Sequence, residues 1–252
     1  MSGGPFRAWL SVTTGSVALV PTFFELQDDA ALLSFEHQLH LSETIGEHAW
    51  ETDLAEPRFS FTGSHPLTCT RVHLLGSAAP GPKSWLWAWA NPSGYRDEII
   101  ELALAVRAFG EEHNVPELSQ AEIPFDAMPG SPTDPAHVTA LMMEATKAVT
   151  KQWTGYQGPV GGGTRAGFLI EHPEFVLPAP AGPRVSRVLQ QGLADLHLYD
   201  HRRAFHAYAV NRGLGAQHNG PQMYISGPGF SVSVQFNPQN LVTAMSVNMG
   251  QQ

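Results

Sequence analysis

Apolar and polar residues alternate along the first part of the chain with two different periods. Residues 26–47 carry apolar side chains three or four positions apart, which predicts an amphipathic helix. We expect Asp28 or Asp29 to cap this helix and Gly46 to end it. Runs with a period of two follow, and they predict strands with one buried face. The predicted strands cover residues 49–54, 58–62, 68–77 and 84–91. Together they predict an antiparallel meander behind the helix.

The last of these strands is the most informative stretch. Trp85, Trp87 and Trp89 alternate with smaller residues, so all three indoles would project from one face of a strand. Pro92 ends the strand because it has no N–H to donate. The helices that follow need an apolar surface to pack against, so we expect this face to be the floor of a core. An exposed aromatic surface that binds a partner is the alternative.

Helical spacing returns after the tryptophans. It predicts helices over residues 95–113 and 135–151, the second with Asp134 as its cap and Pro135 at its first position. The proline-containing loop between them is predicted to be irregular. Gly161–Gly163 precede a strand-like run without the Lys-Ser/Thr of a phosphate-binding loop, which indicates a hairpin tip.

Four prolines between residues 171 and 184 predict an extended connector and a domain boundary. The predicted divisions are a larger helix and meander domain over residues 1–172, the connector over 173–183, and a smaller module over 184–252. The smaller module begins with a long helix over residues 184–211, bent at Gly192 or near Asp200, and ends in strands joined by a turn at residues 237–240.

The fold class follows from this order of elements. We expect an α+β protein in which helices pack on one face of antiparallel meander sheets, arranged as two helix-plus-sheet modules. A chain of 252 residues that is 42% hydrophobic can bury a full core.

Charge and cysteine content limit the classes of binding partner and the cellular compartments that suit this chain. The 14 basic and 23 acidic residues give a net charge of -9, which argues against nucleic acid and against an anionic membrane surface. No apolar run is long enough for a membrane helix. The apolar residues 8–20 lack the cleavage pattern of a signal peptide. A lone cysteine, Cys69, lies in a strand pattern and is expected to be a buried, inert thiol, which fits a reducing cytoplasm.

Two helical faces could present metal ligands. Glu36, His40 and Glu43 are four and three residues apart, and His197 and His201 are four apart. Solvated helical faces have the same pattern, and Leu198 stands where the metalloprotease signature has Glu. We therefore expect neither a metal nor another cofactor, and keep these residues as weak candidates.

The tryptophan strand carries a resemblance to a known family. Residues 85–91, together with Trp50, Asp53 and residues 59–61, resemble an uncharacterised family of bacterial proteins that is known as a domain of unknown function. The resemblance covers about residues 30–170. It implies no activity and no catalytic residue.

The sequence favours a binding function over a catalytic one. No serine lies in a Gly-x-Ser-x-Gly elbow, and sheet edges in both halves can pair with a partner strand. We expect a non-catalytic protein that binds another polypeptide, in the class of bacterial adaptor, chaperone-like or immunity proteins. The alternative is an enzyme, or a binder of a small molecule or metal, with a cleft between the two modules. The candidate binding residues are Trp85, Trp87, Trp89, Tyr199, His197, His201 and Arg203. The sequence predicts no oligomeric state.

Overall fold

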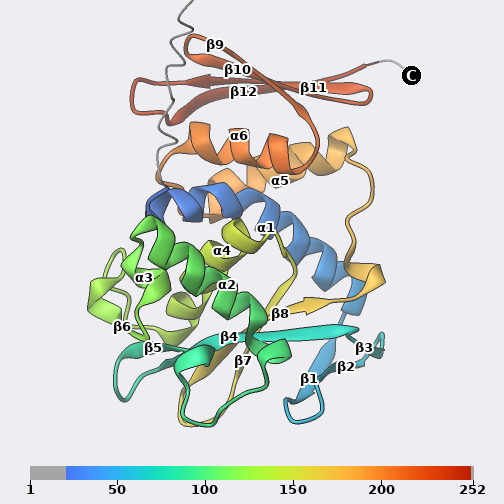
Figure 1. Cartoon of the computed structure of the whole chain (residues 1–252). Coiled ribbons are helices and arrows are strands. Elements are labelled where there is room, and N and C mark those ends of the chain that lie inside the picture. The colour runs from blue at the N-terminus through green and yellow to red at the C-terminus, as the bar shows by residue number, and fades with distance from the viewer. Residues whose placement is uncertain (1–20, 251–252) are drawn as a thin grey trace, which may run out of the picture.

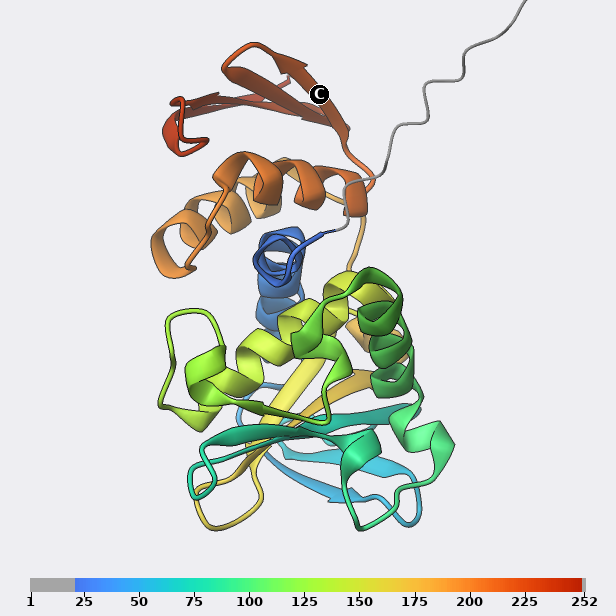
Figure 2. The same cartoon turned by 60° about the vertical axis from the view of Figure 1, so that its left-hand side comes forward.

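The computed structural model describes residues 21–250 as a stack of layers with helix α1 (Phe23–Ile45) in the middle (Figure 1). On one side of α1 lie α2 (Asp97–His113) and α4 (Pro135–Thr150). On the other side lie α5 (Gly182–Asp195) and α6 (His201–Asn211). A sheet covers the outside of each helical layer, and the turned view in Figure 2 shows the same order.

Three antiparallel sheets complete the fold, which confirms the α+β class. The first has the order β1-β2-β3, the second β6-β5-β4-β8-β7, and the third β12-β11-β10-β9. The strands are β1 (His48–Asp53), β2 (Arg58–Gly63), β3 (Leu67–Thr68), β4 (Arg71–Ala79), β5 (Ser84–Trp87), β6 (Glu122–Pro124), β7 (Gly155–Pro159), β8 (Arg165–Glu171), β9 (Gly215–Asn219), β10 (Gln222–Gly227), β11 (Phe230–Phe236) and β12 (Val242–Met249). The short helical segments are η1 (Ala88–Ala90), α3 (Pro116–Ser119), η2 (Phe125–Ala127) and η3 (Pro173–Phe175).

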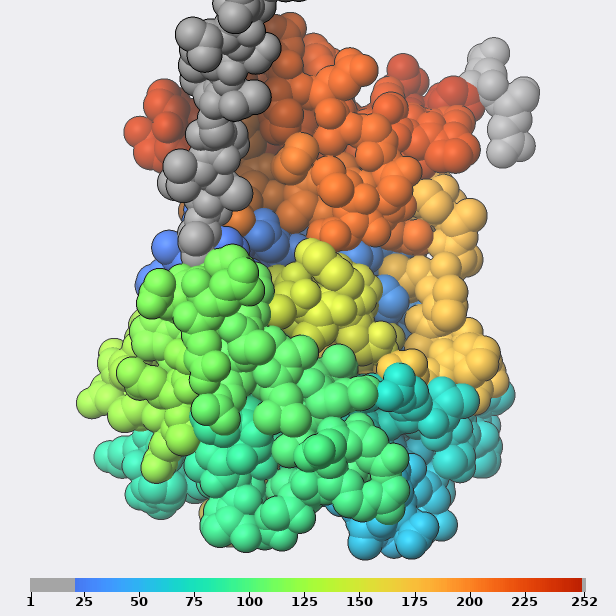
Figure 3. Space-filling model, in the orientation of Figure 1, coloured from blue at the N-terminus to red at the C-terminus, as the bar shows by residue number. Residues whose placement is uncertain are grey.

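Below, the C-terminal module means α5, α6 and the β9–β12 sheet, and the N-terminal module means residues 48–171. Helix α1 contributes to the apolar core on both of its sides. Leu26 and Ala30 pack in the core with Trp85 and Trp87, whereas Leu32 packs in the core of the C-terminal module. On the face drawn in Figure 3, α1 is largely covered by the two neighbouring layers. The domain boundaries proposed from the sequence stay a prediction. The apolar stretch at residues 8–20 lies outside the described residues.

The predicted first helix is confirmed, but its predicted cap is wrong. Thr22 is the N-cap, and it forms a capping box with Glu25, so α1 begins three residues earlier than its apolar pattern indicated. Gly46, with φ at 60°, ends the helix as predicted. Asp28 lies inside the helix, where its carboxylate accepts hydrogen bonds from the segment between α5 and α6.

The tryptophan strand is shorter than predicted. Strand β5 stops at Trp87, and Trp89 lies in the 3₁₀ turn η1, so the three indoles do not share one strand face. Trp85 and Trp87 are fully buried, which confirms the core interpretation for these two. Gly76 makes room for them, because a Cβ atom there would lie 2.6 Å from the Trp85 ring. Trp89 is half-buried, with the Arg107 guanidinium 4.5 Å from its ring centroid.

The predicted single meander in the first half is wrong. The run over residues 68–77 is two strands in different sheets, because the chain leaves the first sheet after β3 and enters the second at β4. Strand β4 has both faces covered: α2 and α4 lie on one, and the β1–β3 sheet brings Phe59 and Phe61 to the other. Its near-continuous burial is typical of a central strand rather than a half-buried one.

The remaining predictions are confirmed in part. Helices α2 and α4 match their predicted spans, and Asp134 caps α4 through the N–H of Ala136. The irregular loop between them was only partly predicted, since it holds α3 and the short strand β6. Gly161–Gly163 form the turn of the β7–β8 hairpin. Cys69 is buried, and burial raises the pKa of its thiol to about 12. No helix within residues 21–250 is long and apolar enough to span a membrane.

The long helix predicted over residues 184–211 is instead two helices. Helix α5 ends at Asp195, and α6 starts at His201 with Asp200 as its N-cap. The break is stabilised from outside, because the Asp28 carboxylate of α1 accepts the N–H groups of Tyr199 and Asp200 at 2.9 and 2.8 Å. A contact across 171 residues thus provides acceptors that the broken helix lacks.

Candidate functional site

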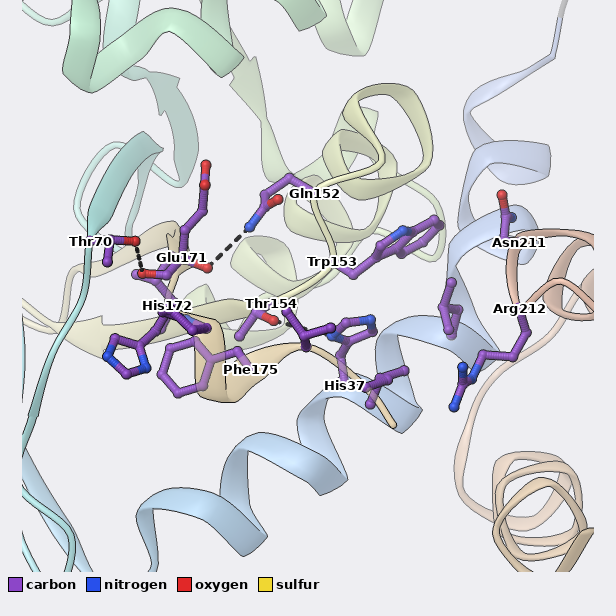
Figure 4. Close-up of a pocket in the computed structure, with 15 residues that line it drawn as sticks. His37, Thr70, Gln152, Trp153, Thr154, Glu171, His172, Phe175, Asn211 and Arg212 are labelled. Atoms are coloured by element: carbon purple, nitrogen blue, oxygen red, sulfur yellow. Dashed lines mark hydrogen bonds between the residues drawn. The ribbon is translucent and has the colours of Figure 1, made fainter. Parts of the chain in front are cut away.

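A pocket of about 510 Å³ lies where the two modules meet beside α1 (Figure 4). Its walls come from α1, the segment between α4 and β7, the end of β8, the proline-rich connector and the end of α6. The lining residues are Leu33, His37, Thr70, Gln152, Trp153, Thr154, Ile170, Glu171, His172, Pro173, Phe175, Val176, Leu177, Asn211 and Arg212. We call this the junction pocket. The cleft that the sequence analysis gave as the alternative site stays a prediction, and its candidate residues His197 and His201 do not line this pocket.

His37 is the central polar group of the junction pocket. Its Nδ1 lies 3.1 Å from the Thr154 hydroxyl. Burial, and then the charges of Lys147 and Arg212, lower the pKa of His37 from 6.5 to about 3. The imidazole is therefore neutral at physiological pH, and it can both donate and accept a hydrogen bond.

Trp153 forms the aromatic part of the wall. Its ring stacks loosely on His37, with 6.5 Å between ring centroids and 21° between planes. The Lys151 ammonium lies 5.7 Å from the indole centroid. Trp153 also packs against the apolar cores on both sides of α1. These contacts fix the ring while leaving it on the pocket wall.

The charged side chains of the pocket already have hydrogen-bond partners. Arg212 donates from Nε to the Glu36 carboxylate at 2.8 Å and from Nη2 at 3.2 Å, and the Tyr208 hydroxyl donates to the same carboxylate at 2.9 Å. At the other end, Glu171 lies 3.0 Å from Nε2 of buried His73. An anionic ligand would find no free positive charge on Arg212, because Glu36 already pairs with it.

Several neutral polar groups on the wall have no partner among residues 21–250. They include Nε2 of His37, the indole N–H of Trp153 and the side-chain amide of Asn211. Figure 4 shows His37 and Trp153 in the middle of the wall, with Glu171 and His172 at one end and Asn211 and Arg212 at the other. The wall thus combines a ring with neutral donors and acceptors, which suits an organic ligand.

A second pocket of about 560 Å³ lies along a different face of α1. It holds a buried network in which Lys147 Nζ donates to the Ser34 hydroxyl at 2.6 Å, and Ser34 donates to Glu144 at 2.6 Å. Lys147 also donates to Glu144 at 2.9 Å. These bonds fasten α1 to α4, and they explain why a lysine is tolerated in the interior.

The candidate binding residues from the sequence do not gather in one place. Trp85 and Trp87 are core residues. Tyr199 and His197 meet at 4.7 Å between ring centroids, and Tyr199 also meets Phe24 at 4.8 Å. The remaining three are placed elsewhere: Trp89 beside Arg107, Arg203 on Asp29 and Glu25, and His201 with its Nδ1 accepting the N–H of Val242.

The weak metal candidates are also separated. Glu36 is occupied by Arg212 and Tyr208, His40 bonds the backbone oxygen of Glu174, and Glu43 pairs with two arginines. His197 lies before α6 rather than inside a helix with His201, so the predicted i, i+4 pair is wrong. Within residues 21–250, no three His, Cys, Asp or Glu side chains are placed to hold a metal ion.

Sequence reasoning missed the residues that line the junction pocket. His37, Trp153, Asn211 and Arg212 come from separate segments, and Arg212 had been interpreted only as part of a helix stop. One signal was available in the sequence. His37 directly follows Glu36 on the predicted first helix, and Leu33 and Leu41 lie four residues before and after it. That signal does not show which segments lie opposite His37. Asn211 and Arg212 reach the pocket only because α6 packs beside α1.

Comparisons with known proteins assign a family to the N-terminal part of the chain. Searches of curated proteins and of solved structures found no match. A family model matches residues 25–173, which contain most of α1, the N-terminal module and the lining residues of the junction pocket up to Pro173. The family is described as a family of unknown function, which agrees with the resemblance seen around the tryptophan strand. Because the match covers more than half of its 252 residues, the chain belongs to this family of unknown function, DUF6882.

Proposed function

We propose that the protein binds a small, uncharged, ring-bearing organic molecule in the junction pocket. The observation that carries the proposal is the neutral polar wall around Trp153, where His37 and Asn211 leave hydrogen-bonding groups unpaired among residues 21–250. The volume of about 510 Å³ falls within the range of about 300–1,000 Å³ that ligand pockets occupy. The ion pair of Arg212 with Glu36 favours a neutral ligand over an anionic one.

The binding geometry follows from the same groups. A flat ring can stack on the exposed part of Trp153, and its polar substituents can bond His37 and Asn211. The neutral imidazole accepts or donates according to the ligand, because its pKa of about 3 keeps it uncharged above pH 4. The ligand would contact both modules and would therefore stabilise their junction.

A matched pair of probes tests the proposal. Nicotinamide and nicotinate have the same ring and differ in charge, so nicotinamide should bind more tightly. The six tryptophans give separate indole N–H signals in a ¹H–¹⁵N NMR spectrum, and Trp153→Phe identifies the relevant one. We expect that signal to move with nicotinamide, while those of buried Trp85 and Trp87 stay in place.

Paired variants locate the site. Asn211→Leu should weaken nicotinamide binding about tenfold, because one hydrogen bond to a neutral group is lost. Asn219→Leu makes the same change on the exposed strand β9, away from the pocket, and should leave binding unaltered. Equal binding of both probes, or an affinity that Asn211→Leu does not change, would contradict the proposal.

A second function is favoured by one exposed aromatic cluster. Phe24 and Tyr199 are 45% and 37% exposed, and they pack edge to face beside His197. Aromatic side chains of this kind are typical anchors at protein interfaces. This cluster is our candidate surface for binding another polypeptide.

A tyrosine of equal exposure provides the control for that surface. Tyr224 on strand β10 is 40% exposed, whereas Tyr199 lies in the segment between α5 and α6. In pull-downs from the native host, a polypeptide captured by the parent chain should be lost with Tyr199→Ser and kept with Tyr224→Ser. Capture that is equal for the two variants counts against this surface.

A further inference from the structure

All Lys, Arg, Asp and Glu residues of the chain lie before Gly213. The net charge of -9 therefore belongs entirely to residues 1–212, and the 40 residues from Gly213 to Gln252 are free of charged side chains except for titratable His218. The sheet formed by strands β9 to β12 lies within this uncharged stretch, at the outer end of the stack (Figures 1 and 2).

Strand β12 is an edge of that sheet. Among residues 21–250 it pairs only with β11. Its ladder is regular from Ala244 to Met249, with an irregularity only near Gln235 and Phe236 on the neighbouring strand. The N–H of Gly250 bonds the oxygen of Gly229 on the β11 side. Because bonding direction alternates along a strand, the N–H and C=O groups of Met245, Val247 and Met249 point away from β11.

Within residues 21–250, this edge lacks the usual protection against pairing. Natural proteins block open edges with lysine, proline, inward-pointing charges or a covering segment. Strand β12 contains no charged residue and no proline, and the side chain of Met249 is 46% exposed. The outer face of the sheet is also uncharged, with Tyr224, Ser233 and Ser246 in one row across it.

We propose that two copies of this chain pair edge to edge through antiparallel β12 strands. The charge distribution selects a second copy as the occupant. Two molecules that each carry a net charge of -9 repel one another least when they meet through the ends that have no Lys, Arg, Asp or Glu side chains. A basic partner protein, by contrast, would be drawn to the acidic remainder of the chain rather than to this end.

One register suits the pattern of β12. With a two-fold axis at Val247, Met245 lies opposite Met249 of the partner copy, and Ser246 lies opposite the partner's Asn248. Apolar side chains then face apolar ones on the inner face, and polar face polar on the outer face. The outward groups of Met245, Val247 and Met249 form about six main-chain hydrogen bonds across the axis. The two four-stranded sheets become one continuous sheet.

Paired charge variants test the interface. Ser246→Lys/Asn248→Lys places lysines opposite one another across the axis, on exposed positions that the monomer tolerates. Tyr224→Lys/Ser226→Lys adds the same charge to the outer face at a distance from β12. Sedimentation equilibrium from about 1 to about 300 µM should show a dimer for the parent chain. We expect dimerisation to weaken about tenfold or more in the first variant and to change little in the second.

Single cysteines test the register. Ser246 and the partner's Asn248 form a non-hydrogen-bonded pair, whose Cα atoms lie about 4.5 Å apart, within disulfide range. Mixing Ser246→Cys with Asn248→Cys should therefore produce a cross-linked dimer under mild oxidation, and neither variant should cross-link alone. Buried Cys69 does not interfere.

The outcomes separate this proposal from other arrangements. A parent chain that stays monomeric at all concentrations overturns it. Equal weakening by the two lysine variants also overturns it, because that result indicates sheets stacked face to face. Self-cross-linking of Ser246→Cys moves the axis by one residue and still supports pairing through β12. These results are independent of the junction pocket, because no residue of β10 or β12 lines it.

Discussion

Helix α1 contacts the two modules in different ways. Towards the N-terminal module it presents mainly apolar side chains, such as Leu26 and Ala30, and the uncharged groups of Gln27 and Ser34. Towards the C-terminal module it presents the apolar side chains of Leu32 and Leu33 and also several acids, four of which pair with arginines of that module. The pairs are Glu25 and Asp29 with Arg203, Glu36 with Arg212, and Glu43 with Arg184 and Arg187.

The difference separates packing from pairing. The first contact depends mainly on the volume of apolar side chains, whereas the second adds ion pairs, which depend on direction and on charge, to its apolar packing. The matched family region, residues 25–173, includes most of α1 and the N-terminal module, against which α1 packs mainly through apolar side chains. The C-terminal module lies outside that region, and it contacts α1 through apolar packing on Leu32 and Leu33 together with ion pairs whose acids come from α1. Perturbing each contact separately should therefore give different responses to charge, volume and pH.

Glu36→Gln should have the largest effect. Glu36 is fully buried, and its loss of charge leaves Arg212 without a counter-ion in the interior. We expect the free energy of unfolding in urea to fall by about 3–5 kcal/mol. Glu36→Leu/Arg212→Met removes both charges and should recover at least half of that loss. A cost below about 1 kcal/mol for Glu36→Gln would mean that the pair does not hold the module.

Leu26→Ala should have the next largest effect, on the other side of α1. The Leu26 side chain is 3% exposed, and its truncation leaves a cavity beside the tryptophan core. We expect a loss of about 2–4 kcal/mol that does not depend on salt. Gln38→Ala, at an exposed position of the same helix, is the control. A strong salt dependence of the Leu26→Ala effect would contradict the volume interpretation.

Two residues of α1 should give opposite pH dependences. Burial lowers the pKa of His37 to about 3, so its contribution to stability is present above pH 6.5 and is lost as the pH falls. Burial raises the pKa of Asp28 from 3.8 to about 6, so its contribution is present below pH 3.8 and is lost as the pH rises. Between pH 4 and 6 the two slopes, each about 1.4 kcal/mol per pH unit, should nearly cancel.

Single variants separate these slopes. Relative to the parent chain, Asp28→Asn should lose about 2 kcal/mol more stability on going from pH 6 to 4, and His37→Gln should gain about the same amount. His137→Gln, at an exposed position, should follow the parent. Urea unfolding at pH 4, 5 and 6 measures all four proteins. Slopes of the same sign for the two variants would refute the assignment.

Elements with local signals could be predicted from the sequence. Helix α4 has its cap and first proline side by side at Asp134 and Pro135, and the β11–β12 turn has Asn237 accepting the N–H groups of Gln239 and Leu241. Gly46 ends α1 through its own backbone conformation. Each signal lies within a few residues of the feature that it specifies.

Features that depend on distant contacts could not be predicted in this way. The break between α5 and α6 is stabilised by Asp28, and the change of sheet after β3 depends on which faces of β4 become covered. The junction pocket has the same origin, because His37, Trp153 and Asn211 meet only after the modules pack on α1. The local pattern of apolar and polar residues does not show which distant segments come into contact.

Glu43→Gln should have the smallest effect, and it tests the role of burial in the charged contact. Glu43 pairs with both Arg184 and Arg187, yet its side chain is 46% exposed, compared with 0% for Glu36. Water and salt screen an exposed pair, so we expect a loss of about 0.5 kcal/mol at low ionic strength that disappears in 0.5 M NaCl. Urea unfolding at two salt concentrations makes the measurement, with Glu36→Gln alongside. If the two variants cost the same, the number of ion pairs rather than their burial holds the C-terminal module on α1.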